Sequence, residues 1–158
     1  NLGVHLRDKN ILILGAGGAV RGVLAPLLKP RPALIVIANR TVSKARDLAE
    51  EFAQYGKLVA CGFEALKGKH FDLVINGTAA SLKGEVPPLP ENLFARRGLA
   101  YDMMYGEKSK PFLDWAALHG ADHVTDGLGM LVEQAAEAFY IWRGVRPDTA
   151  PIIAALRT

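Results

Sequence analysis

The sequence has little of what would hold together a secreted or a metal-bound protein. It contains one cysteine, Cys61, so no disulfide can form within the chain, and its four histidines show no zinc-ligand spacing beside that cysteine. No apolar run reaches the ~18 residues that a membrane span needs, and the first residues do not resemble a signal peptide. We therefore expect no metal site, no membrane segment and a cytoplasmic location.

A strong charge imbalance is also missing. Nineteen Lys and Arg residues against sixteen Asp and Glu give a net charge of +3, which is too small and too scattered to favour a nucleic-acid groove. The 158 residues are 50% hydrophobic and 22% charged, which favours a single globular domain with one core. We expect a small-molecule partner and no nucleic acid, and the net charge is compatible with a polyanionic small molecule.

What the sequence does contain is a regular succession of short apolar runs. They lack strict alternation, which is typical of parallel strands that are buried on both faces. The expected strands are residues 11–14, 33–38, 58–60, 73–75, 99–101 and 123–124. Helical patterns separate them or follow them, at residues 19–28, 43–55, from about Ser109, 129–142 and 147–157. This order predicts an α/β fold, a Rossmann-like doubly wound parallel sheet with helices on both faces.

Two local features complete the expected fold. The segment 84–90 contains three prolines, so it reads as an irregular loop. Ser43 is expected to cap the second helix.

A glycine-rich turn follows the first expected strand and leads into a helix, which is the context of the dinucleotide fingerprint. Gly15 can form the tight turn and Gly17 can let the backbone approach a pyrophosphate, whose charge the start of the helix favours. The third glycine of the GxGxxG pattern falls on Val20, so we expect Gly18 and Gly22 to share its close-packing role. The alternative is a glycine-rich turn without a ligand.

The end of the second expected strand indicates which cofactor is preferred. It reads Asn39-Arg40-Thr41, without the Asp or Glu that NAD enzymes place on the ribose hydroxyls ~20 residues after the first glycine. Arg40, Thr41, Ser43 and Lys44 can instead donate hydrogen bonds to a 2′-phosphate. The sequence therefore predicts NADP as the cofactor, and a solvated basic turn is the alternative.

Four motifs, in this order and spacing, closely resemble those of shikimate dehydrogenases. They are GAGGAVRG from Gly15, NRTVSKA from Asn39, YDMMYGEKSKPF from Tyr101 and DGLGMLVEQAAEAF from Asp126. The resemblance implies that the pyrophosphate of NADP lies on Gly15, Ala16, Gly17, Gly18 and Ala19. It also implies that the adenosine ribose and its 2′-phosphate are surrounded by Asn39, Arg40, Thr41, Val42, Ser43 and Lys44.

The resemblance also implies which residues lie at the nicotinamide and substrate end of the site. Met103 and Gly127 would line the nicotinamide pocket, Asn76 and Thr78 would lie beside the cofactor, and Tyr105 and Gln134 would face the substrate. After Thr78 the family usually has a glycine a few residues on, whereas this chain reads Ala79-Ala80-Ser81-Leu82. Packing in the core or between domains, rather than cofactor contact, is expected for Tyr101, Met104, Trp115, Phe139 and Trp142.

The reaction that the resemblance implies is reversible, NADPH-dependent reduction of 3-dehydroshikimate to shikimate, a step of aromatic amino-acid (chorismate) biosynthesis. In the family, a lysine and an aspartate of an N-terminal substrate domain manage the proton. We therefore expect residues 1–158 to be the NADP-binding domain without that substrate domain, with no catalytic acid or base, and to be inactive alone. Two alternatives stay open, a quinate or dual quinate/shikimate dehydrogenase and a catalytically silent NADP-binding module.

Overall fold

A computed structural model describes residues 2–157 and contains one parallel sheet of six strands in the order β3-β2-β1-β4-β5-β6. The strands are β1 Asn10–Leu14, β2 Leu34–Ala38, β3 Leu58–Cys61, β4 Phe71–Asn76, β5 Phe94–Asp102 and β6 His123–Thr125. The helices are α1 Gly18–Leu28, α2 Val42–Phe52, α3 Lys110–Leu118, α4 Leu128–Arg143 and α5 Ala150–Leu156. The strand order reverses between β1 and β4, where ligands of open α/β sheets usually bind.

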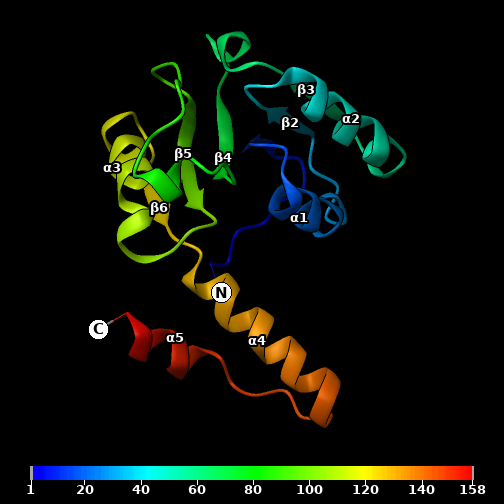
Figure 1. Ribbon diagram of the computed structural model, residues 1–158, viewed down its shortest axis with the longest axis vertical. Helices are drawn as coiled ribbons and strands as arrows, with labels where there is room; N and C mark the ends of the chain where they lie inside the picture. The colour runs from blue at the N-terminus through cyan, green and yellow to red at the C-terminus, as the bar shows by residue number, and fades with distance from the viewer. Residues whose placement is uncertain (1, 158) are drawn as a thin grey trace.

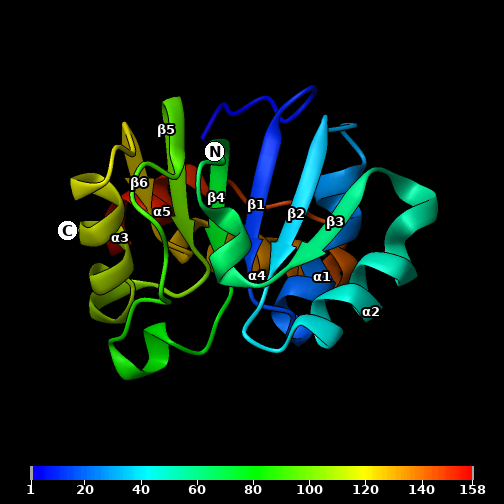
Figure 2. The same cartoon turned by 90° about the horizontal axis from the view of Figure 1, so that it is seen from above.

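The two faces of the sheet have separate cores, as a doubly wound fold requires. Because successive side chains of a strand point to opposite faces, Ile11 and Ile13 pack with α1 and α2, while Leu12 and Leu14 pack with α3. Figures 1 and 2 show α3 at the β6 end of the sheet and α2 at the β3 end. In Figure 1, α4 and α5 lie beside each other below the sheet. The Rossmann-like prediction is confirmed.

All six expected strands and all five expected helices are present, with differences at their ends. The second helix stops at Phe52, and Ala53–Tyr55 continues as a 3₁₀ turn. The last helix begins only at Ala150. The expectation that Ser43 caps α2 was wrong, because the cap position is Thr41 and no side chain makes a capping hydrogen bond there. The proline-rich segment 84–90 is irregular, as expected.

The close packing that the fingerprint assigns to its third glycine is supplied from another strand. A Cβ at Gly18 or Gly22 would meet no atom within 4 Å, so the prediction that these two glycines share that role was wrong. A Cβ at Gly77, directly after β4, would instead lie 2.5 Å from Cγ2 of the fully buried Val20. The missing glycine of α1 is thus matched by a glycine that follows β4.

This packing predicts opposite effects at two glycines. Gly77→Ala should lower the free energy of unfolding by about 1–3 kcal/mol, because its methyl group would overlap Val20. The control Gly22→Ala, in the exposed interior of α1, should raise it by up to about 1 kcal/mol. The double variant Val20→Ala/Gly77→Ala should cost less than the sum of the single changes. Urea unfolding of these three variants and of Val20→Ala alone measures each free energy of unfolding. Additive losses in the double variant would contradict this packing.

Within residues 2–157, none of the helices combines the length and the apolar character that crossing a bilayer requires.

Candidate functional site

A cleft of about 610 Å³ opens at the carboxyl ends of the central strands. The glycine turn after β1 forms one wall, and the segment that follows β4 forms the opposite wall. The β2 end of the cleft carries Asn39 and Arg40, and the β5 end carries Met103 and Met104. The structure brings together ten of the predicted cofactor residues here, namely Gly15, Ala16, Gly17, Gly18, Ala19, Asn39, Arg40, Asn76, Thr78 and Met103.

The glycine turn leaves room for a ligand above the start of α1. Gly15 has φ +103°, and a Cβ there would lie 2.9 Å from the carbonyl oxygen of Gly77, so only glycine fits. At Gly17 and Gly18 an added Cβ would meet nothing within 4 Å. The first N–H groups of a helix have no intrahelical partner, and the first turn of α1 carries no acidic side chain. An anion such as a pyrophosphate fits this position.

The β2 end of the cleft carries a positive charge. Arg40 is exposed, and none of the ion pairs formed by residues 2–157 involves it. The Asn39 amide donates a 2.8 Å hydrogen bond to the carbonyl of Thr41, which fixes the turn. The cleft wall described here contains one carboxylate, that of Glu85 on the opposite loop. A phosphate beside Arg40 therefore meets no acidic side chain on the same wall.

Several predicted residues lie away from the cleft wall. Thr41, Val42, Ser43 and Lys44 belong to the start of α2 and do not line the cleft. Tyr105 is half exposed, and Gln134 is exposed on α4. Neither of these two predicted substrate-binding residues lines the cleft. Met130, four residues before Gln134, does line it.

Gly127 acts on the cleft indirectly. Its N–H donates a 2.8 Å hydrogen bond to the carbonyl of Met104, and a Cβ at this position would collide with the carbonyl of Met103. Gly127 therefore lies against Met103 without lining the cleft itself, and its place at the nicotinamide pocket stays a prediction.

A buried hydrogen-bond network joins the ends of β4 and β5 beneath the cleft. Asp102 is fully buried, and its Oδ2 accepts hydrogen bonds from the Ser81 hydroxyl at 2.8 Å and from the Asn76 amide at 3.0 Å. Its Oδ1 accepts the N–H of Met104 at 2.8 Å. The side-chain Oδ1 of Asn76 in turn accepts hydrogen bonds from both the N–H and the hydroxyl of Thr78. The network therefore fixes both the loop after β4 and the segment after β5.

The hydrogen-bond donors around the Asp102 carboxyl group are all neutral. Burial raises the pKa of Asp102 above its ordinary value, and the hydrogen bonds from Met104, Ser81 and Asn76 oppose that rise. The charge of Asp126 adds a smaller upward effect on the same pKa. Each donor therefore stabilises the ionised form of Asp102.

Sequence reasoning missed this network and part of the cleft wall. Ser81 and Asp102 have no motif of their own that marks them as polar core residues, although Asp102 lies inside the YDMMY segment. Met104 was expected only to pack, yet it lines the cleft. Phe63, after β3, also lines it, and its place in the cleft depends on strand order rather than on any local pattern.

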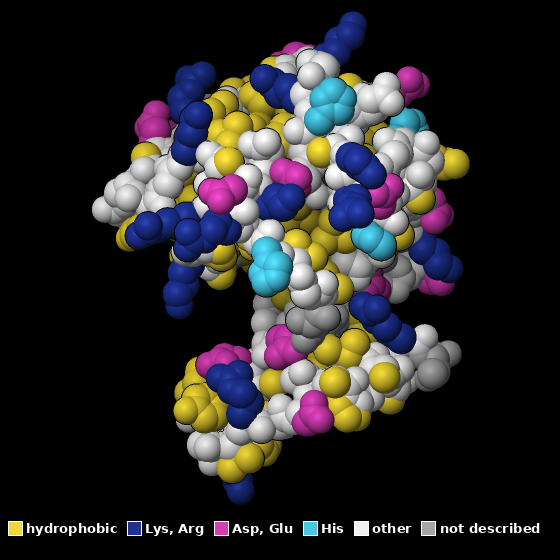
Figure 3. Space-filling view, turned by 180° about the vertical axis from the view of Figure 1, so that it is seen from behind, with side chains coloured by type: hydrophobic (Ala, Val, Ile, Leu, Met, Phe, Trp, Pro, Cys, Tyr) yellow, Lys and Arg dark blue, Asp and Glu magenta, His cyan; other side chains and the backbone are white. Residues whose placement is uncertain are grey.

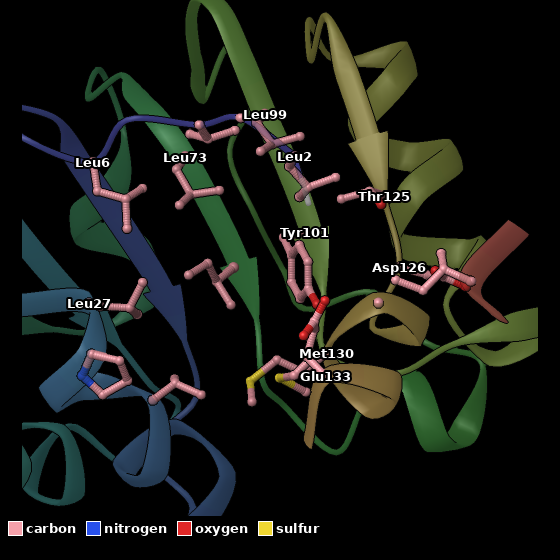
Figure 4. A pocket seen from close by; sticks show the side chains of 18 of the residues that line it. Leu2, Leu6, Leu27, Leu73, Leu99, Tyr101, Thr125, Asp126, Met130 and Glu133 are labelled. Carbon is pink, nitrogen blue, oxygen red and sulfur yellow. The ribbon is translucent and has the colours of Figure 1, made fainter. Parts of the chain in front are cut away.

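A second, larger cavity of about 730 Å³ lies on the α1 face of the sheet (Figure 4). Its walls are mainly apolar, with Leu27, Leu73 and Leu99 among them. Its polar rim carries Asp126, whose carboxylate lies 3.8 Å from the guanidinium of Arg157. Because the glycine turn and Arg40 do not line it, this cavity lacks the phosphate-binding groups of the cleft.

Residues 2–157 contain no group of three or more His, Cys, Asp or Glu side chains that could hold a metal ion.

The Asp102 network predicts a pH-dependent cost for losing one donor. Ser81→Ala removes a hydrogen bond to the carboxylate, so the pKa of Asp102 should rise further. The pKa of Asp102 in the folded chain then exceeds its pKa in the unfolded chain by more. The free energy of unfolding therefore falls by a larger amount as pH rises through the range between these two pKa values. We expect a cost of about 1.5–3 kcal/mol at neutral pH and about 0.5–1.5 kcal/mol near pH ~3, where Asp102 is protonated.

The matched control is Ser109→Ala. Ser109 is also buried, but its hydroxyl donates to the neutral carbonyl of Gly106 at 2.7 Å, so its cost should not change with pH. Chemical unfolding of both variants across this pH range gives the comparison. If the loss in the free energy of unfolding varied with pH in the same way in both serine variants, an ionised Asp102 in the network would be contradicted.

Comparison with known proteins agrees with this geometry. The family model described as "Shikimate / quinate 5-dehydrogenase" matches residues 1–83, and that described as "Shikimate 5'-dehydrogenase C-terminal domain" matches residues 127–157. The chain is 58% identical over 157 residues to a Cellvibrio japonicus protein named shikimate dehydrogenase (NADP(+)), an alignment that covers 99% of this chain and 57% of that protein.

Solved structures give the same picture. An Ael1 enzyme from Pseudomonas putida is 49% identical with a TM-score of 0.88, covering 98% of this chain and 57% of that one. A 5-ketofructose reductase from a Gluconobacter strain is 30% identical with a TM-score of 0.79, covering 98% and 58%. The chain thus spans less than two thirds of the length of these relatives. With one family model matching more than half of its residues, the chain belongs to the shikimate/quinate 5-dehydrogenase family.

Proposed function

We propose that this chain is the NADP-binding domain of an NADP-dependent shikimate dehydrogenase, an oxidoreductase that reversibly reduces 3-dehydroshikimate to shikimate in the cytoplasm. The observation that carries the proposal is the cleft itself, with an open helix start at one place and Arg40 at another. The curated relatives named shikimate dehydrogenase (NADP(+)), at 55–60% identity, support the choice of cofactor and substrate.

The role of this chain in the reaction is to bind and orient the cofactor. Bound NADPH supplies the hydride. The N–H groups at the start of α1 would hold the pyrophosphate, and Arg40 would bind the 2′-phosphate through charge-assisted hydrogen bonds. Met103 and Met130 cover the β5 end with apolar surface, which excludes water from the reacting ring.

The substrate and the proton-transfer groups belong, in this proposal, to a further domain. Support comes from the large apolar side chains that α4 and the segment after it expose, since such patches mark interaction surfaces (Figure 3). Ile141 is 71% exposed and Trp142 82%. Tyr105 and Gln134, which do not line the cleft, would meet the substrate together with residues of that domain.

Quinate is the second substrate that the proposal includes, because the family model that matches residues 1–83 covers both shikimate and quinate dehydrogenases.

The proposal predicts a selective effect at Arg40. Arg40→Ala should weaken NADPH binding about tenfold or somewhat more, because a hydrogen bond to a charged group contributes ~1.5–3 kcal/mol and the exposure of Arg40 favours the lower end. NADH lacks the 2′-phosphate, so its affinity should barely change. Fluorescence titration of both cofactors at one fixed salt concentration measures this difference.

The matched control is Arg46→Ala, which removes the same charge from an exposed position of α2 outside the cleft. It should leave the ratio of NADPH to NADH affinity unchanged. Equal losses of both cofactors in Arg40→Ala would mean that Arg40 supports the turn rather than the phosphate, and the assignment of the 2′-phosphate to it would be abandoned.

A further inference from the structure

Asp102 is an ionisable group in a position where charge is energetically unfavourable. It is fully buried at the carboxyl end of β5, and none of the ion pairs formed by residues 2–157 includes it. Its partners are three neutral donors from three separate segments: Asn76 at the end of β4, Ser81 in the short turn Ser81–Lys83, and Met104 after β5. A buried carboxylate that only joined the core would be replaced by apolar packing at little cost.

The groups that Asp102 holds form the two sides of the cleft at its β5 end. On one side, Asn76 and Ser81 fix the loop in which Thr78, Ala79 and Ala80 line the cleft. On the other side, the Met104 N–H is fixed directly, and the Met103 N–H donates a 2.9 Å hydrogen bond to the carbonyl of Asn76. A displacement of the Asp102 carboxyl group would therefore move both walls of the cleft.

An ionised carboxylate matches this set of donors. It offers two oxygens that accept and never donate, and here they receive three hydrogen bonds. An asparagine at this position would turn an NH₂ group toward Asn76 and Ser81 or toward the Met104 N–H. One donor would then face another donor whichever way the amide is turned.

We propose that Asp102 is a positioning residue for the nicotinamide end of the cleft, because its carboxylate holds the loop after β4 and the segment Met103–Met104 at a fixed separation. This inference rests on the proposed function, since it assumes that the cleft binds NADP. It assigns to Asp102 an effect on the ring-bearing half of the cofactor and not on the adenosine half, which Arg40 binds at the other end.

The test compares two ligands on this chain by calorimetry. One is NADP⁺, and the other is 2′-phospho-ADP-ribose, which keeps the phosphates and both riboses but lacks the nicotinamide ring. Ser81→Ala should weaken NADP⁺ binding about 2- to 10-fold, the effect of one net hydrogen bond, and change the binding of 2′-phospho-ADP-ribose less than twofold. Asp102→Asn should show the same selectivity with a larger loss.

Ser109→Ala is again the control, because it removes a buried hydroxyl outside the cleft and should change neither affinity. If Asp102→Asn does not fold, Ser81→Ala alone decides, since it leaves the carboxylate two of its three donors. Equal losses for both ligands, or none for NADP⁺, in Ser81→Ala would overturn the inference while leaving the proposed function intact. A wild-type chain that binds neither ligand would overturn the proposed function, and this inference with it.

Discussion

The backbone of the glycine turn after β1 passes so close to the turn after β4 that neither Gly15 nor Gly77 has room for a side chain. A Cβ on Gly15 would lie 2.9 Å from the carbonyl oxygen of Gly77, and one on Gly77 would lie 2.5 Å from the side chain of Val20. This contact occurs where the strand order reverses, between β1 and β4. The start of α1, the loop that carries Thr78 and the cleft between them all take their positions from it.

The second constraint is electrostatic, and it acts on the same cleft from below. A sheet edge where several strands end leaves many polar groups that must be paired, and the network around Asp102 pairs them without any basic side chain. The positive groups, in contrast, lie at the surface of the cleft, where Arg40 and the start of α1 face solvent. The buried Asp102 carboxyl group and the exposed positive charges are thus separated, which leaves Arg40 available to an anion.

The sequence predicted the fold well because the signals were local. Each buried strand is a short apolar run, and the glycine turn lies between a strand and a helix, so the succession of strands and helices along the chain and the main cleft residues could be anticipated. What could not be anticipated depends on contacts between distant segments. Gly77 replaces the third glycine only because β4 lies beside β1, and Ser81 meets Asp102 only because β5 lies beside β4. Tyr105 and Gln134, taken from the resemblance alone, lie outside the cleft wall and stay predictions.

We propose that the cleft over the glycine turn binds NADP, with the pyrophosphate at the start of α1 and the 2′-phosphate at Arg40. The most direct measurement is an NMR titration of the ¹⁵N-labelled chain with NADP⁺, which reports the amide of each residue separately. We expect the largest chemical-shift changes at the amides of Gly17, Gly18 and Arg40. Shifts that are largest around the apolar cavity, at Leu73 and Leu99, or that are absent at saturating NADP⁺, would contradict it.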